Sequence, residues 1–207
     1  MSFFATLCAS LEGNCHAGSG RRIGSFLLAA AAIWLAACSS TPKLTYDLNS
    51  ASGVFPARGA KGQIAIPVPE ATLPANSNSI VVRTGPQSVE YLSGAQWADK
   101  LPPLIQSRLI ESFQNAHVVR AAGKPGMLAD ATLQTNLRRF DFDPSRNEVF
   151  VEISAQLARA DGRVIAERLF SAACPALSTE PAAIAAAFDT ALGRVMREIV
   201  LWAAPKI

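Results

Sequence analysis

The C-terminal half of the chain alternates apolar and polar residues over three long segments, which is the period of a β-strand with one buried face. Asp143-Pro144-Ser145-Arg146-Asn147 and Asp161-Gly162 separate these segments and are typical of turns. Both positions of Asp161-Gly162 tolerate positive φ, as a tight hairpin requires. The pattern predicts an antiparallel sheet with one face buried and the other wet or covered by a partner. The predicted strands are 131–138, 149–157 and 164–173.

The first half of the mature chain contains shorter strand patterns. Pro67 and Pro69 limit the strand around Ile64 and Ile66 to an edge or a strand end, because proline has no N–H to donate. Gly85-Pro86 predicts the turn of a hairpin between two neighbouring strands. The Gly and Pro content of residues 50–62 predicts a loop. The predicted strands are 44–48, 64–68, 80–84, 87–92 and 117–120.

Two segments have the spacing of amphipathic helices. The first places Leu104, Leu109 and Phe113 on one face, with Pro102-Pro103 either in its first turn or marking a kink after Trp97-Ala98-Asp99. The second begins after a cap at Ser178 or Thr179, with Glu180 and Pro181 in its first turn. We expect its apolar stripe to pack against the sheet: Ile184, Phe188, Ala191, Leu192, Val195, Met196, Ile199 and Trp202.

The N-terminus has the anatomy of a secretory signal peptide. Arg21-Arg22 precede an apolar run of 15 residues, Ile23 to Ala37, which is shorter than the about 20 that span a membrane. Leu35-Ala36-Ala37-Cys38 ends this run like a bacterial lipoprotein signal, so we expect cleavage before Cys38 and lipidation of its thiol. Ser39 at the next position suggests sorting to the outer membrane. The alternative is an ordinary signal or anchor with a chance cysteine.

These signals divide the chain into a signal peptide at 1–37, a lipidated N-terminus with a short tether at 38–43, and one domain at 44–207. Residues 1–20 are either a long n-region or follow an unused upstream start codon. The mature part carries 17 basic and 15 acidic residues. Because they form no basic block, a nucleic-acid partner is not expected.

Catalytic and metal-binding motifs are sparse in the mature chain. Cys174 is its remaining thiol besides Cys38, and we expect this side chain to act as a small buried hydrophobic residue at the end of a strand. His117, its one histidine, stands at a helix–strand junction without a nucleophile or orienting group in the sequence around it. Turn chemistry explains Asp141 and Asp143 better than metal binding does. We therefore expect no catalytic site, no metal and no cofactor.

Several segments of the mature chain follow one another in a distinctive order and spacing. They are Tyr46-Asp47-Leu48, Ile64 to Pro69, Ser79 to Thr84, Trp97-Ala98 with the helix to Phe113, Ala160 to Ile165, and the alanine-rich final helix. In this order they resemble the auxiliary lipoproteins of ABC-type transporters that work with MCE (mammalian cell entry) proteins. The stretch Leu73 to Asn78 departs from a Leu-Asp-Arg-Pro run that is frequent in that family, so any contact of that loop does not carry over.

The resemblance implies an α+β domain with a mixed, largely antiparallel sheet and two helices on one face. It also implies a non-catalytic outer-membrane lipoprotein on the periplasmic side, which docks an MCE-domain protein and aids lipid passage between the membranes. Loop 70–79 and strand 80–83, with Val82 and Arg83, are the expected partner surface. Assembly into a homo-oligomer is left open.

Two other classes remain at this point. A structural or assembly lipoprotein of the envelope would share the anchor and the fold, and a neighbouring gene set for an MCE protein, permease and ATPase would separate the two. A periplasmic lipid-acting enzyme would need convergent titratable groups in a cleft.

Overall fold

The structure is a computed structural model that describes residues 42–53, 55 and 62–207. The predicted signal peptide and the lipidation site Cys38 lie outside the described residues, as do residues 54 and 56–61 of the predicted loop 50–62. The strands are β1 (Leu44–Tyr46), β2 (Gln63–Ala65), β3 (Glu70–Ala71), β4 (Ser79–Arg83), β5 (Val89–Trp97), β6 (Ala121–Gly123), β7 (Ala131–Asp143), β8 (Glu148–Arg159) and β9 (Val164–Pro175). The helices are α2 (Leu101–Ala116), α3 (Pro181–Ala203) and a final 3-10 turn (Ala204–Lys206).

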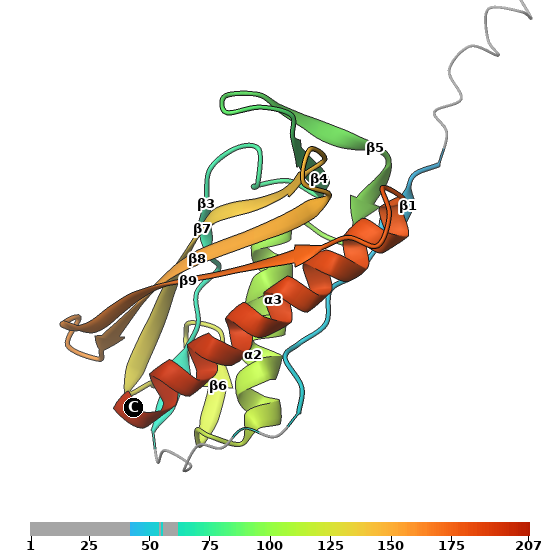
Figure 1. The fold of residues 1–207 in the computed structure, drawn as a ribbon. Coiled ribbons are helices and arrows are strands. Elements are labelled where there is room, and N and C mark those ends of the chain that lie inside the picture. Colours follow the sequence, from blue (N-terminus) through green and yellow to red (C-terminus); the bar gives the residue numbers. More distant parts are fainter. Residues whose placement is uncertain (1–41, 54, 56–61) are drawn as a thin grey trace, which may run out of the picture. The chain divides into compact units, whose positions relative to one another are not determined.

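The long strand β7 organises one mixed sheet (Figure 1). On one side it pairs in turn with β2, β3 and β4, all parallel, and on the other side it pairs antiparallel with β8. Strand β9 pairs with β8, and β5 pairs antiparallel with β4. Together with α2 and α3, this confirms the predicted α+β fold with a mixed, largely antiparallel sheet.

Cross-strand pairing assigns each residue to a face, because directly paired residues lie on the same side of a sheet. Leu133 pairs with Leu157 and Leu137 pairs with Ile153, and all four are buried with the helices. A bulge between Leu137 and Arg139 then shifts the phase of β7. Beyond it, Phe140 and Phe142 face the helices, while Arg139 and Asp141 lie on the opposite side, which we call the open face.

The helix α2 begins and ends where backbone chemistry requires. Pro102 and Pro103 occupy the first turn, where an N–H has no intrahelical partner, so the first-turn interpretation is confirmed. His117 caps the C-terminus in the left-handed conformation with φ 53°. The predicted strand at 117–120 is therefore wrong: the strand is β6, three residues long from Ala121, and it pairs with β2.

The helix α3 packs its apolar stripe into the core, as predicted. Its N-cap, however, is Glu180 without a side-chain hydrogen bond, and the expected cap Ser178 instead accepts the N–H of Glu180 at 3.3 Å. Phe188 stacks on Phe140 with ring centroids 4.5 Å apart and meets the edge of Trp97 at 5.5 Å. This aromatic cluster joins α3, β7 and β5.

Several strand ends and one turn differ from the sequence prediction. Strand β2 ends at Ala65 because Pro67 and Pro69 cannot continue the ladder, whereas β5 runs on to Trp97 instead of stopping at residue 92. In the β8–β9 turn only Gly162 has positive φ, at 85°. Asp161 contributes there by accepting the N–H of Arg163 at 2.9 Å.

An ion pair ties the first strand segment to α2. Arg108 Nη2 donates to Asp47 Oδ2 at 2.7 Å, and the Leu48 N–H donates to Asp47 Oδ1 at 2.8 Å. Partial burial acts to raise the pKa of Asp47, but the hydrogen bonds from Arg108 and Leu48 outweigh it and lower that pKa. The ion pair therefore contributes stability above the ordinary Asp pKa and loses it as the pH falls through the lowered value.

We expect Asp47→Asn to lower the free energy of unfolding at neutral pH. The difference from wild type should shrink as the pH falls below about 4 and vanish below the lowered pKa of Asp47. Urea titrations of both proteins over that pH range measure it. Glu111→Gln is the matched control, because it leaves the bond between Asp47 and Arg108 in place and should keep the pH dependence. A difference that grows towards acid would contradict this assignment.

Candidate docking surface

Two arginines hold one buried carboxylate on the open face. Arg83 donates from Nε and Nη2 to Asp141 Oδ2, both at 3.1 Å. Arg139 donates from Nε to Oδ2 at 3.2 Å and from Nη2 to Oδ1 at 2.8 Å. The Asp141 side chain is 2% exposed, against 31% for Arg83 and 37% for Arg139. The interpretation of Asp141 as a turn residue is therefore wrong, whereas Asp143 does bind the turn, accepting the N–H and hydroxyl of Ser145.

Further charged and aromatic groups surround this cluster. The hydrogen bond to Asp141 raises the pKa of Arg139, and the guanidinium carbon of Arg139 lies 4.2 Å from the centre of the Phe150 ring. Arg138 pairs with Glu152 at 3.3 Å beside it. Because four charge-assisted hydrogen bonds satisfy Asp141, its burial is compensated, and the two arginines are held rigidly at the surface.

Exposed apolar side chains of β5 lie beside these arginines on the open face. Tyr91 pairs with Val81, and Val89 pairs with Arg83, so both lie on the open face. Tyr91 is 53% exposed and Val89 41%. Arginine and aromatic residues are the types that dominate the energy of protein interfaces. We call Arg83, Val89, Tyr91, Arg139 and Phe150 the docking patch.

The structure separates the two residues of the expected partner surface. Arg83 belongs to the docking patch, but Val82 pairs with Phe142 and packs against the core on the helix side. Loop 70–79 is tied to the start of α2, because the Leu101 N–H donates to the Ser77 carbonyl at 2.9 Å. Leu73 in that loop is 80% exposed. A change at Val82 therefore tests the fold rather than a contact.

The remaining singled-out residues lie apart from the docking patch. His117 is exposed at the end of α2, with Nδ1 2.9 Å from the Asn115 carbonyl. Cys174 lies at the end of β9 as expected, but it is half-buried rather than buried. Within the described ranges, no group of three potential metal ligands occurs. In that same part of the chain, no helix is long and apolar enough to cross a membrane.

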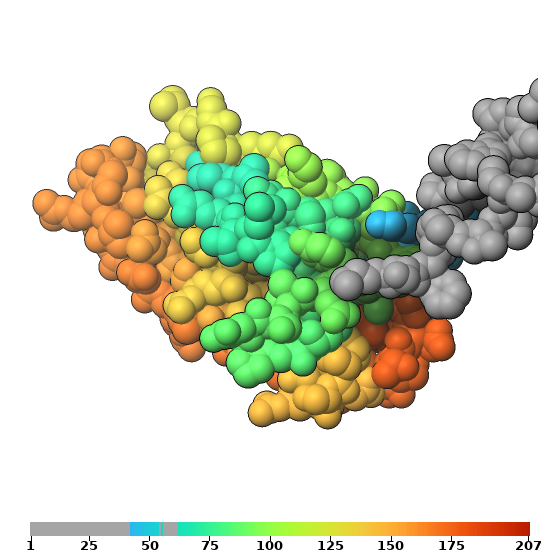
Figure 2. All heavy atoms as spheres, turned by 90° about the horizontal axis from the view of Figure 1, so that it is seen from above, coloured from blue at the N-terminus to red at the C-terminus, as the bar shows by residue number. Residues whose placement is uncertain are grey.

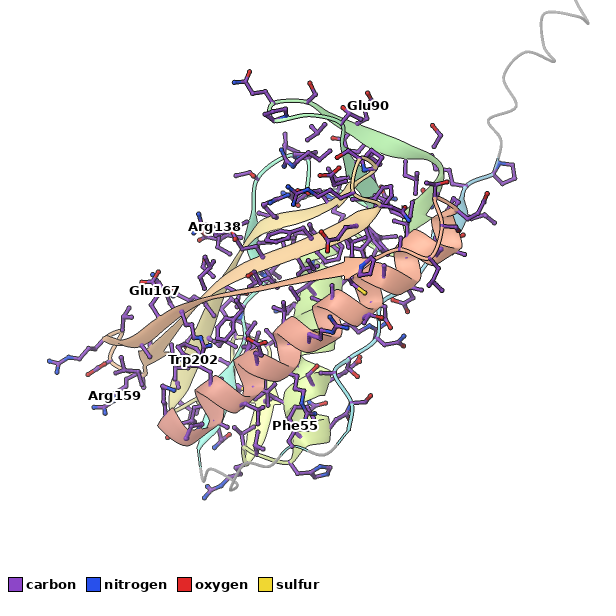
Figure 3. The ribbon with its side chains drawn as sticks, viewed as in Figure 1. Phe55, Glu90, Arg138, Arg159, Glu167 and Trp202 are labelled. Atoms are coloured by element: carbon purple, nitrogen blue, oxygen red, sulfur yellow. The ribbon has the colours of Figure 1, made fainter. Side chains whose placement is uncertain are left out.

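Figure 3 shows Arg138 and Glu167 on the side of the sheet turned away from α3. This agrees with the pairing of Glu167 with Gln156, a polar residue of the open face. The open face thus carries polar and charged side chains from β7, β8 and β9, together with the apolar side chains Val89 and Tyr91 of β5 and Phe150 of β8. Polar, charged and apolar surfaces therefore lie next to one another on this face of the sheet.

The sequence profile of a family described as an ABC-type transport auxiliary lipoprotein component matches residues 46–200, which run from the last residue of β1 through β9 and most of α3. The chain belongs to this family. The matched range covers both the docking patch and the aromatic cluster.

The chain is also similar to several known proteins. An uncharacterized protein of Bradyrhizobium diazoefficiens is 33% identical over 167 residues, which are 77% of this chain and 44% of that relative, so the chain spans less than half of the relative's length. The crystal structure of protein XCC0632 from Xanthomonas campestris is similar with a TM-score of 0.74 and 29% identity, covering 78% of this chain and 94% of that one. A second crystal structure of an uncharacterized protein, at TM-score 0.59 and 15% identity, covers 80% of this chain and 99% of its own, and shows the fold alone.

Proposed function

We propose that the protein is a non-catalytic, lipid-anchored outer-membrane component of an MCE-type ABC transport system. In this role it docks the MCE-domain protein on the periplasmic side and aids lipid passage between the inner and outer membranes. Membership of the auxiliary lipoprotein family supports the transport role. The docking patch carries the proposal, because it places two rigid arginines beside exposed Tyr91 and Val89 on a sheet face that the helices leave open.

The anchor supplies the second part of the proposal. A lipid on Cys38 and a tether to residue 43 would hold the domain close to its membrane, since about 3.3–3.6 Å per residue is the reach of extended chain. Partner binding would then take place at that membrane surface.

The test is capture of the MCE protein from native membranes. Tyr91→Ala should weaken the capture at least fivefold, because a buried interface tyrosine commonly contributes more than about 1 kcal/mol. Leu177→Ala is the matched control, since Leu177 is 98% exposed but lies outside the docking patch. Both variants must show wild-type urea midpoints, so that folding is not the variable.

The outcomes separate the surface from the partnership. Equal capture by Tyr91→Ala and wild type would reject the docking patch. No capture by the wild type in native membranes would reject the MCE partnership and favour a structural or assembly lipoprotein instead.

A further inference from the structure

The ladder along β7 is interrupted between β2 and β3. Ala65 pairs with Thr132 and Glu70 pairs with Asn136, so five steps along one chain match four along β7. The extra residue falls in Ile66-Pro67-Val68-Pro69, where Pro67 and Pro69 have no N–H to donate to β7. The segment 66–69 therefore arches out of the ladder, and we call the hollow beside it the arch pocket.

The arch pocket has a volume of about 350 Å³, within the range of small-molecule sites. It opens on the open face, because Gln134 pairs with Gln156 and Asn136 with Ser154 on that side. In Figure 2 the blue-green atoms of the segment with β3 border the yellow and orange atoms of β7 and β8. The pocket is distinct from the docking patch, with which it shares no lining residue.

Its polar lining is largely unused within the described residues. The side chains of Gln134, Gln156 and Ser154 make no hydrogen bond there, and Asn136 reaches Glu70 only at 3.5 Å. Glu70 forms no ion pair in that part of the chain. Such convergent, unpaired polar groups are what a specific ligand site provides.

The chemical types of the residues that line the arch pocket indicate which class of ligand it would bind. No lining residue is positively charged, which disfavours phosphate and carboxylate ligands. An ammonium group has donors only, so it would leave the N–H groups of three primary amides without an acceptor. A hydroxyl both donates and accepts, and therefore satisfies amide N–H, amide carbonyl and carboxylate together. Pro67 and Val68 offer an apolar wall for the C–H groups between hydroxyls.

We propose that the arch pocket binds a polyhydroxylated group of the size of a sugar ring. Either a glycolipid headgroup or a saccharide free of lipid presents this chemistry. The inference does not depend on the MCE partnership, because none of the pocket residues belongs to the docking patch.

The experiment uses the full lipoprotein in a detergent without sugar groups, titrated with methyl β-glucopyranoside and observed by saturation-transfer NMR. The double variant Asn136→Ala/Gln156→Ala should bind roughly tenfold more weakly, through the loss of two sets of hydrogen bonds. Gln87→Ala is the matched control, because Gln87 is an exposed amide in the β4–β5 turn. Urea midpoints of all proteins verify folding.

Phosphatidylcholine vesicles with and without a glucosyl diacylglycerol distinguish the two sources. Capture that requires the glucosyl lipid assigns the pocket to a lipid headgroup, and binding of the soluble glucoside without vesicle capture assigns it to a free saccharide. No binding of either probe, equal binding by the double variant, or tighter binding of ethanolamine than of the glucoside would each overturn the proposal.

Discussion

Replacing Cys38 with Ala is expected to abolish lipid attachment. The thiol of Cys38 is the proposed acceptor, and the apolar run Ile23 to Ala37 ends directly before it. Metabolic labelling with radioactive palmitate should give a band for the wild type and background for Cys38→Ala. The precursor should also stay uncut, because the expected cleavage depends on the cysteine that follows the cut.

Cys174→Ala is the matched control for that experiment. Cys174 is the other cysteine of the mature chain, it is half-buried at the end of β9, and its variant should label like the wild type. A Cys38→Ala protein that is cleaved and held in the membrane like the wild type would refute the anchor.

Phe188→Ala is expected to lower the free energy of unfolding by about 3–5 kcal/mol. The ring is fully buried, stacks on Phe140 and meets the edge of Trp97, so its removal leaves a cavity between α3, β7 and β5. The rigid sheet and helix around the cavity limit collapse, which keeps the cost at the level of large-to-small core changes. Urea unfolding in detergent should show a lower midpoint with an unchanged slope.

Leu177→Ala serves as the control here too. This side chain is 98% exposed, and its removal should change stability by less than about 0.5 kcal/mol. If Phe188→Ala lowered the free energy of unfolding by less than about 1 kcal/mol, the aromatic cluster would contribute less to stability than its packing indicates.

The bulge in β7 between Leu137 and Arg139 is indicated by the sequence. Alternation from Ala131 predicts an apolar residue at position 139, but the chain has Arg139 there. A charged residue in the apolar phase is the signal of a bulge, and the bulge between Leu137 and Arg139 is what turns Asp141 towards the open face. The interpretation of Asp141 as a turn residue beside Asp143 does not take this signal into account.

Other differences have no local signal. The end of α2 at His117 depends on a left-handed residue that is not glycine, and the sequence does not mark it. Val82 and Arg83 lie on opposite faces of the sheet. Which face each one takes is set by the pairing of β4 with β7, 60 positions further along the chain. Sequence distance hides such pairings because parallel strands join remote segments.

The amino-acid sequence by itself determined the elements whose period is long and regular: the strands β7, β8 and β9, the apolar stripe of α3 and the proline start of α2. It also determined the family, through the order of its short segments. Periodicity suffices for these features because burial on one face repeats every two or every 3.6 residues. The tertiary structure alone decided the Arg83–Asp141–Arg139 cluster, the docking patch and the arch pocket. Each of them joins side chains from strands that are distant in the chain, and only the register of the sheet brings those side chains together.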